Sequence, residues 1–98
     1  MNSIELIRLA LNLPTNWEVS AVEFSGEDSQ TLHITACYLR EDKFINEDGT
    51  ESDICSFIDR SFRYKNLFQL TCYIQCSVPQ IRDGNGTVRQ VKTPWSHY

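Results

Sequence analysis

The fold is decided by the segment FRYKNLFQLTCYIQCSVPQIRDGNGTVRQVKTPW, which runs from Phe62 to Trp95. Apolar and polar residues alternate from Phe68 to Arg82, which is the pattern of a strand with one buried face. The apolar members of this stripe are Leu70, Cys72, Ile74, Cys76 and Val78. The DGNG sequence at 83–86 tolerates positive φ and predicts a tight hairpin loop. We therefore expect 87–93 to return as the partner strand, which ends at Pro94.

A second hairpin and a helix are expected in the first 40 residues. WEVSAVEF (Trp17–Phe24) and TLHITACYL (Thr31–Leu39) flank a polar turn, which is typical of two antiparallel strands. A helix is expected over Ser3–Asn12, because Asn2 and Glu5 have capping-box spacing and Pro14 disfavours its continuation. Its apolar stripe, which should cover one face of the sheet, comprises Ile4, Ile7 and Leu11, widened by Leu6, Ala10 and Leu13.

The segment between the two hairpins is less regular. REDKFINEDGTES, at 40–52, is charged and rich in turn residues, and Asp48-Gly49 predicts a tight reversal. Residues 54–64 fit either a helical face or a strand, and we favour a strand near the end of this segment. Together these elements predict an α+β fold in which an N-terminal helix packs on a meandering antiparallel β-sheet.

Length and composition favour a single globular domain over residues 1–98. The chain has 98 residues, of which 41% are hydrophobic and 11% aromatic, enough for one modest core. It has no apolar run of membrane-spanning length, and its first residues lack the basic and apolar regions of a signal peptide. We therefore expect a cytoplasmic protein with no membrane partner.

Charge is distributed unevenly along the chain. The net charge is −4, but residues 1–58 hold three basic and eleven acidic side chains, whereas residues 59–98 hold six basic and two acidic ones. Aromatic side chains at Phe62, Tyr64 and Tyr73 lie among the basic residues of the second half. This combination suits contact with nucleic acid through phosphates and stacked bases. The predicted nucleic-acid-binding residues are Arg60, Arg63, Lys65, Arg82, Arg89 and Lys92.

The competing interpretation of these residues is that the aromatic side chains form core and the charges keep the fold soluble. Metal and catalytic sites are not predicted. Cys72 and Cys76 would lie ~13 Å apart along one strand, too far for one zinc ion or a disulfide, and are expected in the core. Neither histidine, His33 or His97, has a catalytic context. We therefore expect no enzyme activity, no cofactor and no small-molecule substrate.

Several segments resemble the N-terminal zinc-finger domain of bacterial insertion-sequence transposases of the ISL-three family. They are FRYKNLFQ at 62–69, Tyr73-Ile74, SVPQIR at 77–82, VRQV at 88–91 and Pro94-Trp95. The first half is also similar, in LIRLALNLP at 6–14, Trp17–Val19, Val22–Phe24 and Leu32–Ile34. The chain departs from the family pattern where Phe62 replaces a tryptophan and Gln80 an arginine. The resemblance implies a zinc-ribbon-like hairpin at the C-terminal end of the fold.

The metal ligands of that family are missing. Its two cysteine knuckles would fall on INEDG at 45–49 and on DGNGT at 83–87, so the resemblance places ligands at Ile45, Asp48, Asp83 and Gly86. A structural zinc ion contributes ~10–16 kcal/mol of apparent binding energy, which must be offset when it is lost. We expect Asp-Gly turns to reverse the chain in its place, giving a degenerate zinc finger without metal.

The resemblance implies a non-catalytic, transposase-like module related to the end-binding domain that acts in transposition. The helix-turn-helix and catalytic parts of the family are expected to be absent, because the chain stops soon after Trp95. The expected partners are DNA, bound weakly, or a full-length transposase that the module regulates. The alternative function is a protein-interaction or dimerisation module without DNA binding, since exposed sheet edges invite pairing with a second copy.

Overall fold

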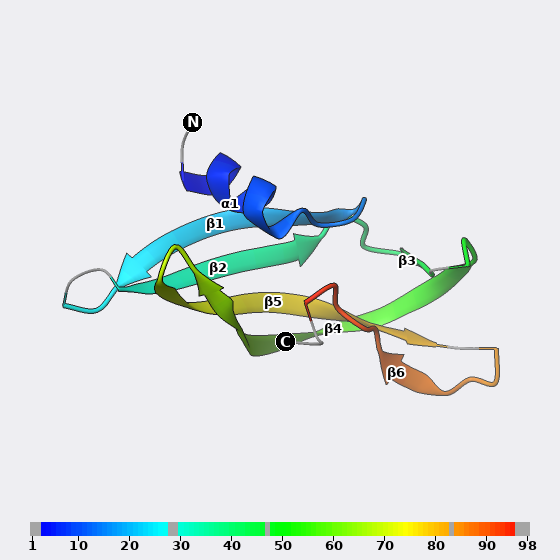
Figure 1. Cartoon of the computed structure of the whole chain (residues 1–98). Coiled ribbons are helices and arrows are strands. Elements are labelled where there is room, and N and C mark those ends of the chain that lie inside the picture. Colours follow the sequence, from blue (N-terminus) through cyan, green and yellow to red (C-terminus); the bar gives the residue numbers. More distant parts are fainter. Residues whose placement is uncertain (1–2, 28–29, 47, 83, 96–98) are drawn as a thin grey trace.

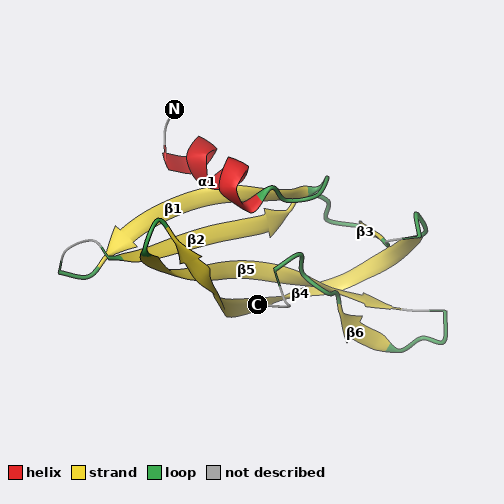
Figure 2. Ribbon diagram, viewed as in Figure 1, coloured by secondary structure: helices red, strands yellow, loops and turns green. Residues whose placement is uncertain are grey.

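The computed structural model describes residues 3–27, 30–46, 48–82 and 84–95, and over these it shows one short helix and a curled sheet of six strands (Figures 1 and 2). The elements are α1 (Ser3–Leu11), β1 (Trp17–Ser25), β2 (Thr31–Tyr38), β3 (Lys43–Ile45), β4 (Glu51–Leu67), β5 (Leu70–Arg82) and β6 (Val88–Gln90). The strand order in the sheet is β1-β2-β5-β4-β3, and β6 also pairs with β5. The fold is therefore α+β and consists mostly of sheet.

The longest element pair is the antiparallel ribbon of β4 and β5. The segment 54–64, which fitted either helix or strand, belongs to β4, and β5 carries the predicted buried stripe. The predicted start of β5 at Phe68 lies two residues too early, because Phe68 and Gln69 form the turn between the strands. Both have positive φ, 52° and 64°, as a type I′ turn requires.

The expectation of a purely antiparallel sheet is wrong, because β2 and β5 are parallel. Their buried stripes lie side by side, with Leu32 opposite Cys72 and Ala36 opposite Cys76. The chain leaves β2, passes through β3 and runs the length of β4 before β5 returns beside β2 (Figure 1). The strand with the most continuous apolar stripe thereby takes the centre of the sheet, where both of its edges are paired.

Helix α1 packs on β1, as expected, but with a narrower contact face. Ile7 is buried, whereas Leu6 and Ala10 are exposed and do not widen the buried stripe. Arg8 fixes the helix to β1, because its Nη2 donates to the Glu18 carboxylate at 2.7 Å and to the Val19 carbonyl at 3.2 Å. The helix ends one residue earlier than predicted, at Leu11.

The C-terminal segment completes the core. Its residues Val91 and Trp95 are 2% exposed, and the Trp95 indole meets Trp17 and Phe62 edge-on, at centroid distances of 5.4 and 5.8 Å. The Val91 amide continues the β6 ladder by donating to the Pro79 carbonyl at 3.1 Å. This segment therefore joins the C-terminal hairpin to the first strand of the chain.

Both predicted chain reversals are present. Gly49 has a φ of 88° in the turn between β3 and β4, where the Asp48 carboxylate accepts hydrogen bonds from the amide (2.9 Å) and hydroxyl (2.6 Å) of Thr50. These bonds lower the pKa of Asp48 from its ordinary value. Gly86, with a φ of 80°, lies in the second reversal, which brings β6 back onto β5; Asp83 of that loop lies outside the described residues.

Candidate nucleic-acid interface

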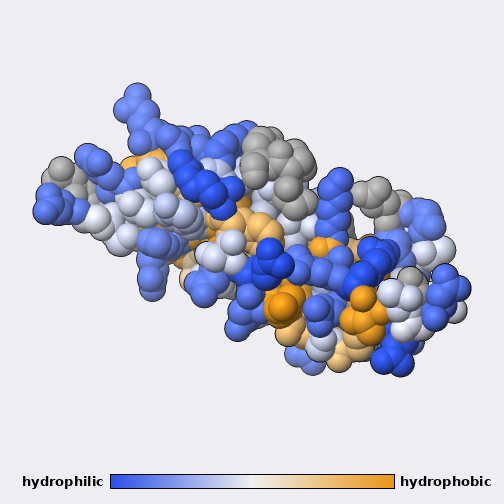
Figure 3. Space-filling view, turned by 90° about the horizontal axis from the view of Figure 1, so that it is seen from below, coloured by the Kyte–Doolittle hydropathy of each residue, from blue (hydrophilic) through white to orange (hydrophobic). Residues whose placement is uncertain are grey.

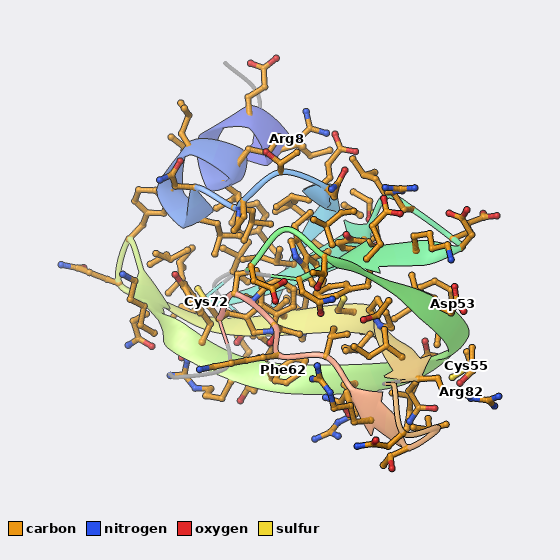
Figure 4. All side chains as sticks on the ribbon, turned by 90° about the vertical axis from the view of Figure 1, so that its right-hand side faces the viewer. Arg8, Asp53, Cys55, Phe62, Cys72 and Arg82 are labelled. Carbon is orange, nitrogen blue, oxygen red and sulfur yellow. The ribbon has the colours of Figure 1, made fainter. Side chains whose placement is uncertain are left out.

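The six predicted basic residues lie along the β4–β5 ribbon and on the segment that follows it, and do not form one cluster. Arg63 lies opposite Tyr73, whereas Arg82 lies nine residues further along β5, ~30 Å away at the strand rise. Arg82 sits opposite Asp53, and both lie with Cys55 at one end of the ribbon (Figure 4). Arg60 donates to the Gln90 side chain on β6 at 2.9 Å. The candidate interface therefore consists of smaller groups of side chains and not of all six basic residues together.

One group is a row of three side chains on the exposed face of the sheet. His33 on β2, Tyr73 on β5 and Arg63 on β4 lie directly opposite one another in the two strand registers. The His33 and Tyr73 rings are stacked, with centroids 5.8 Å apart and planes 19° from parallel. The Arg63 guanidinium, which comes from the strand on the other side of β5, lies over the Tyr73 ring at 5.6 Å from its centroid. We call these three residues the stacked row.

Hydrogen bonds hold both ends of the stacked row in place. Arg63 donates from Nη1 to the carbonyls of Tyr64 and Cys72, the latter at 3.1 Å, and from Nη2 to the Asn66 side chain at 2.7 Å. At the other end, the His33 Nε2 and the Ser25 hydroxyl are 2.8 Å apart. The middle ring, Tyr73, is 39% exposed. The row thus presents an ordered aromatic and cationic surface to solvent.

A second group surrounds an open hollow of about 770 Å³. It lies at the start of β1, near Trp17, whereas the stacked row lies near the end of that strand, where His33 pairs with Glu23. Its aromatic wall consists of Trp17, Tyr38 and Phe44, with ring centroids 5.0 Å apart for Trp17–Tyr38 and for Tyr38–Phe44. Arg89 and Lys92, two of the predicted residues, also line it. Sequence reasoning missed this hollow because its walls come from segments that only the curled sheet brings together.

The remaining predicted residues have local roles. The Arg60 guanidinium lies 5.8 Å from the centre of the Phe62 ring, and the Lys65 ammonium lies 5.7 Å from that of Tyr64. Such cation–π contacts attract a basic group to the face of an aromatic ring. His33 was expected on the face opposite the apolar stripe, and it is there; His97 lies outside the described residues. Sequence alternation could have suggested His33, but only the parallel β2–β5 register places it beside Tyr73.

The cysteines are free, and their environments differ. Cys72 and Cys76 are buried in the core, as expected. Burial, with a smaller effect of Cys37 and Asp59, raises the pKa of Cys76 to about 12, so its thiol stays protonated and is a poor nucleophile. Cys55 is exposed, and its Sγ donates to the Gln80 carbonyl at 3.3 Å.

The described ranges 3–27, 30–46, 48–82 and 84–95 contain no group of three or more His, Cys, Asp and Glu side chains that could hold a metal ion. Within the same ranges, no helix has the length and apolarity needed to cross a membrane. Comparisons with protein-family models, with curated proteins and with solved structures found no match for this chain.

Proposed function

We propose that this chain is a non-catalytic nucleic-acid-binding module of the kind found at the DNA-recognition end of transposases. The observation that carries the proposal is the stacked row of His33, Tyr73 and Arg63 on the exposed sheet face. Nucleic-acid bases stack on aromatic rings and on guanidinium groups that are exposed on a sheet. Basic side chains near such a surface bind the phosphates of the same strand. Binding should be weak, because the whole chain carries a net charge of −4.

The resemblance to ISL-three transposases supplies the biological setting of this proposal. The two expected knuckle positions coincide with reversals that use Gly49 and Gly86 at positive φ. At the first of them, Asp48 bonds to Thr50 and so tightens the turn. In this proposal the turns replace zinc in a degenerate ribbon-like hairpin, and the module regulates a full-length transposase or binds terminal DNA in the cytoplasm.

Titration of fluorescent oligonucleotides at two salt concentrations tests the proposal. Single-stranded and duplex forms should both lose affinity as salt rises, because cation–phosphate contacts release counterions. Tyr73→Ala should weaken single-strand binding by roughly 5- to 150-fold, the equivalent of ~1–3 kcal/mol for one stacked base. Gln75→Ala, on the same face of β5 two residues away, is the matched control and should leave binding unchanged. Absent binding, or equal affinities for the Tyr73 and Gln75 variants, would contradict the proposal.

A second candidate function is protein interaction through the edge of β4. β3 pairs with β4 only at 51–53, and the described residues place no strand beside residues 55–63 of this edge. All residues from Cys55 to Ser61 are exposed, including Phe57 (42%) and Ile58 (38%). Figure 3 shows apolar surface among hydrophilic side chains on the side of the molecule where β4 and β6 lie. A long bare edge of this kind recruits another strand, and sedimentation analysis of the purified chain tests whether it does.

A further inference from the structure

We propose that the hollow at the start of β1 binds a nucleoside phosphate, with the base against its aromatic wall and the phosphate at Arg89 and Lys92. The inference goes beyond the proposed function, because this site is separate from the stacked row, and it departs from the sequence-based expectation of no small-molecule substrate. The hollow has a volume of about 770 Å³, within the ~300–1,000 Å³ that small-molecule sites occupy. We call it the aromatic hollow after the rings of Trp17, Tyr38 and Phe44.

The aromatic wall is in place before a ligand binds. The Trp17 ring meets those of Tyr38 and Phe44 edge-on, at centroid distances of 5.0 and 6.4 Å. It also meets the buried Trp95 ring edge-on at 5.4 Å, so the core holds it in position. The Trp17 amide donates to the Pro14 carbonyl at 3.2 Å, which fixes the backbone there. A wall that is already ordered loses little side-chain entropy when a flat ring packs against it, so it suits a base.

Two polar groups in the lining can bond to the edge of a base. The Tyr38 hydroxyl accepts from the Ile45 amide at 3.1 Å, and its own proton has no acceptor among the residues that the structure describes, although Tyr38 is only 8% exposed. The Asn16 side-chain amide likewise makes no hydrogen bond within those residues. A buried donor without an acceptor favours a ligand that supplies one, and base edges carry carbonyl and ring-nitrogen acceptors.

Two basic side chains of the lining are available to an anion. Arg89 and Lys92 are exposed, and neither makes a hydrogen bond or an ion pair within 3–27, 30–46, 48–82 and 84–95. Arg60, by contrast, already donates to the Gln90 side chain. Arginine binds phosphate through two parallel hydrogen bonds, and lysine binds it as a compact point charge.

The β5–β6 register places Arg89 on the same face of the sheet as the aromatic wall. Arg89 lies directly opposite Ile81, which is fully buried, so the two side chains share the core face. Tyr38 is the last residue of the buried stripe of β2 and lies on that face too. The stacked row lies on the opposite face, because His33 alternates with this stripe. The aromatic hollow is therefore a second site and not an extension of the row.

The lining of the aromatic hollow is basic although the chain is acidic. The chain holds 13 Asp and Glu residues and has a net charge of −4. Among the described residues that line the hollow, none is acidic, whereas Arg89 and Lys92 are basic. Two cations match a phosphate monoester, which carries a charge of about −1.5 to −2 at neutral pH. The combination of aromatic wall, polar edge and paired cations thus matches the three parts of a nucleoside phosphate.

Titration of the isotopically labelled chain with adenosine 5′-monophosphate, followed by amide NMR, tests the proposal. The chain has two tryptophans and hence two indole N–H signals, and Trp17→Phe identifies which belongs to Trp17. That signal should shift and saturate. Adenosine and ribose 5-phosphate should each bind about tenfold more weakly or worse, because each lacks one of the two recognised groups. No shift of the Trp17 signal at about 10 mM nucleotide would overturn the proposal.

Variants of the lining separate the phosphate contacts from the base contacts. Arg89→Ala and Lys92→Ala should each raise the Kd of the nucleotide by about tenfold, because each removes a charge-assisted contact. Phe44→Leu keeps an apolar side chain but removes a ring, and should raise the Kd by about fivefold or more. Arg82→Ala is the matched control, since Arg82 is also exposed but lies outside the lining, and should leave the Kd unchanged. Equal affinities of the three alanine variants would overturn the proposal. Circular dichroism checks that each variant is folded.

The same chemistry occurs in a free nucleotide and at the phosphorylated end of a nucleic-acid strand. Tighter binding of a 5′-phosphorylated trinucleotide, with the same dependence on Arg89, would identify the strand end as the ligand, and equal affinities would identify the free nucleotide. Tyr73→Ala should leave the mononucleotide Kd unchanged, because Tyr73 does not line the hollow. Oligonucleotide binding that depends on Tyr73, without any mononucleotide binding, would overturn this inference and leave the proposed function standing.

Discussion

The two-residue turn between β4 and β5 should be replaceable by a more favourable sequence, with a gain in stability. Phe68 and Gln69 occupy left-handed φ values of 52° and 64°, where a residue with a side chain costs ~1–2 kcal/mol. Asn-Gly is the sequence that a type I′ turn prefers. The double substitution Phe68→Asn, Gln69→Gly should therefore relieve strain at both positions.

The size of the gain follows from three contributions. Relief at the two positions amounts to ~2–3 kcal/mol, and the added freedom that glycine gives the unfolded chain subtracts ~0.4–1 kcal/mol. Phe68 is 58% exposed, so loss of its remaining packing subtracts up to ~1 kcal/mol. The net expectation is an increase of ~1 kcal/mol in the free energy of unfolding.

Urea denaturation followed by circular dichroism measures this change. With a slope of ~1–2 kcal/mol per molar urea, the midpoint should rise by ~0.5–1 M. Gln69→Ala is the control, because alanine keeps the side-chain Cβ that makes positive φ costly, and it should move the midpoint little. A lower midpoint for the Asn-Gly variant would refute the reasoning, since it would mean that Phe68 stabilises the fold through packing that outweighs its strain.

Three further changes should have measurable effects. Trp95→Ala should lower the free energy of unfolding by ~3–5 kcal/mol, because it empties a fully buried site. Trp95→Phe should lower it much less, since the buried indole Nε1 has no hydrogen-bond acceptor within the described residues and its removal breaks no bond. Thermal melts of the two variants measure the difference. The hydrogen bonds that lower the pKa of Asp48 stabilise the fold above the unfolded value of 3.8, and this contribution is lost as pH falls from that value through the lower pKa of the folded state. Thr50→Ala should therefore flatten the dependence of the urea midpoint on pH between about 5 and about 2. Iodoacetamide should label the exposed Cys55 in the native protein, whereas the buried Cys76, with a pKa raised to about 12, should react only after unfolding, as mass spectrometry of the labelled peptides would show.

Strand β5 was predictable from the sequence because it is buried on one face and exposed on the other, which imprints a period of two on its residues. Strand β4 was ambiguous over 54–64 for the opposite reason. From Cys55 to Ser61 both faces are exposed, so burial imposes no alternation on the side chains there. The turn at Phe68-Gln69 was hidden because neither residue is a usual choice at positive φ.

The parallel pairing of β2 with β5 could not be derived from either strand alone. Both strands have a buried stripe that fits any neighbour with a matching one, and the choice depends on how the long β4–β5 ribbon folds back. This pairing also creates the stacked row. Sequence reasoning singled out Arg63 and Tyr73, which share a hairpin, but His33 joins them only across the parallel register.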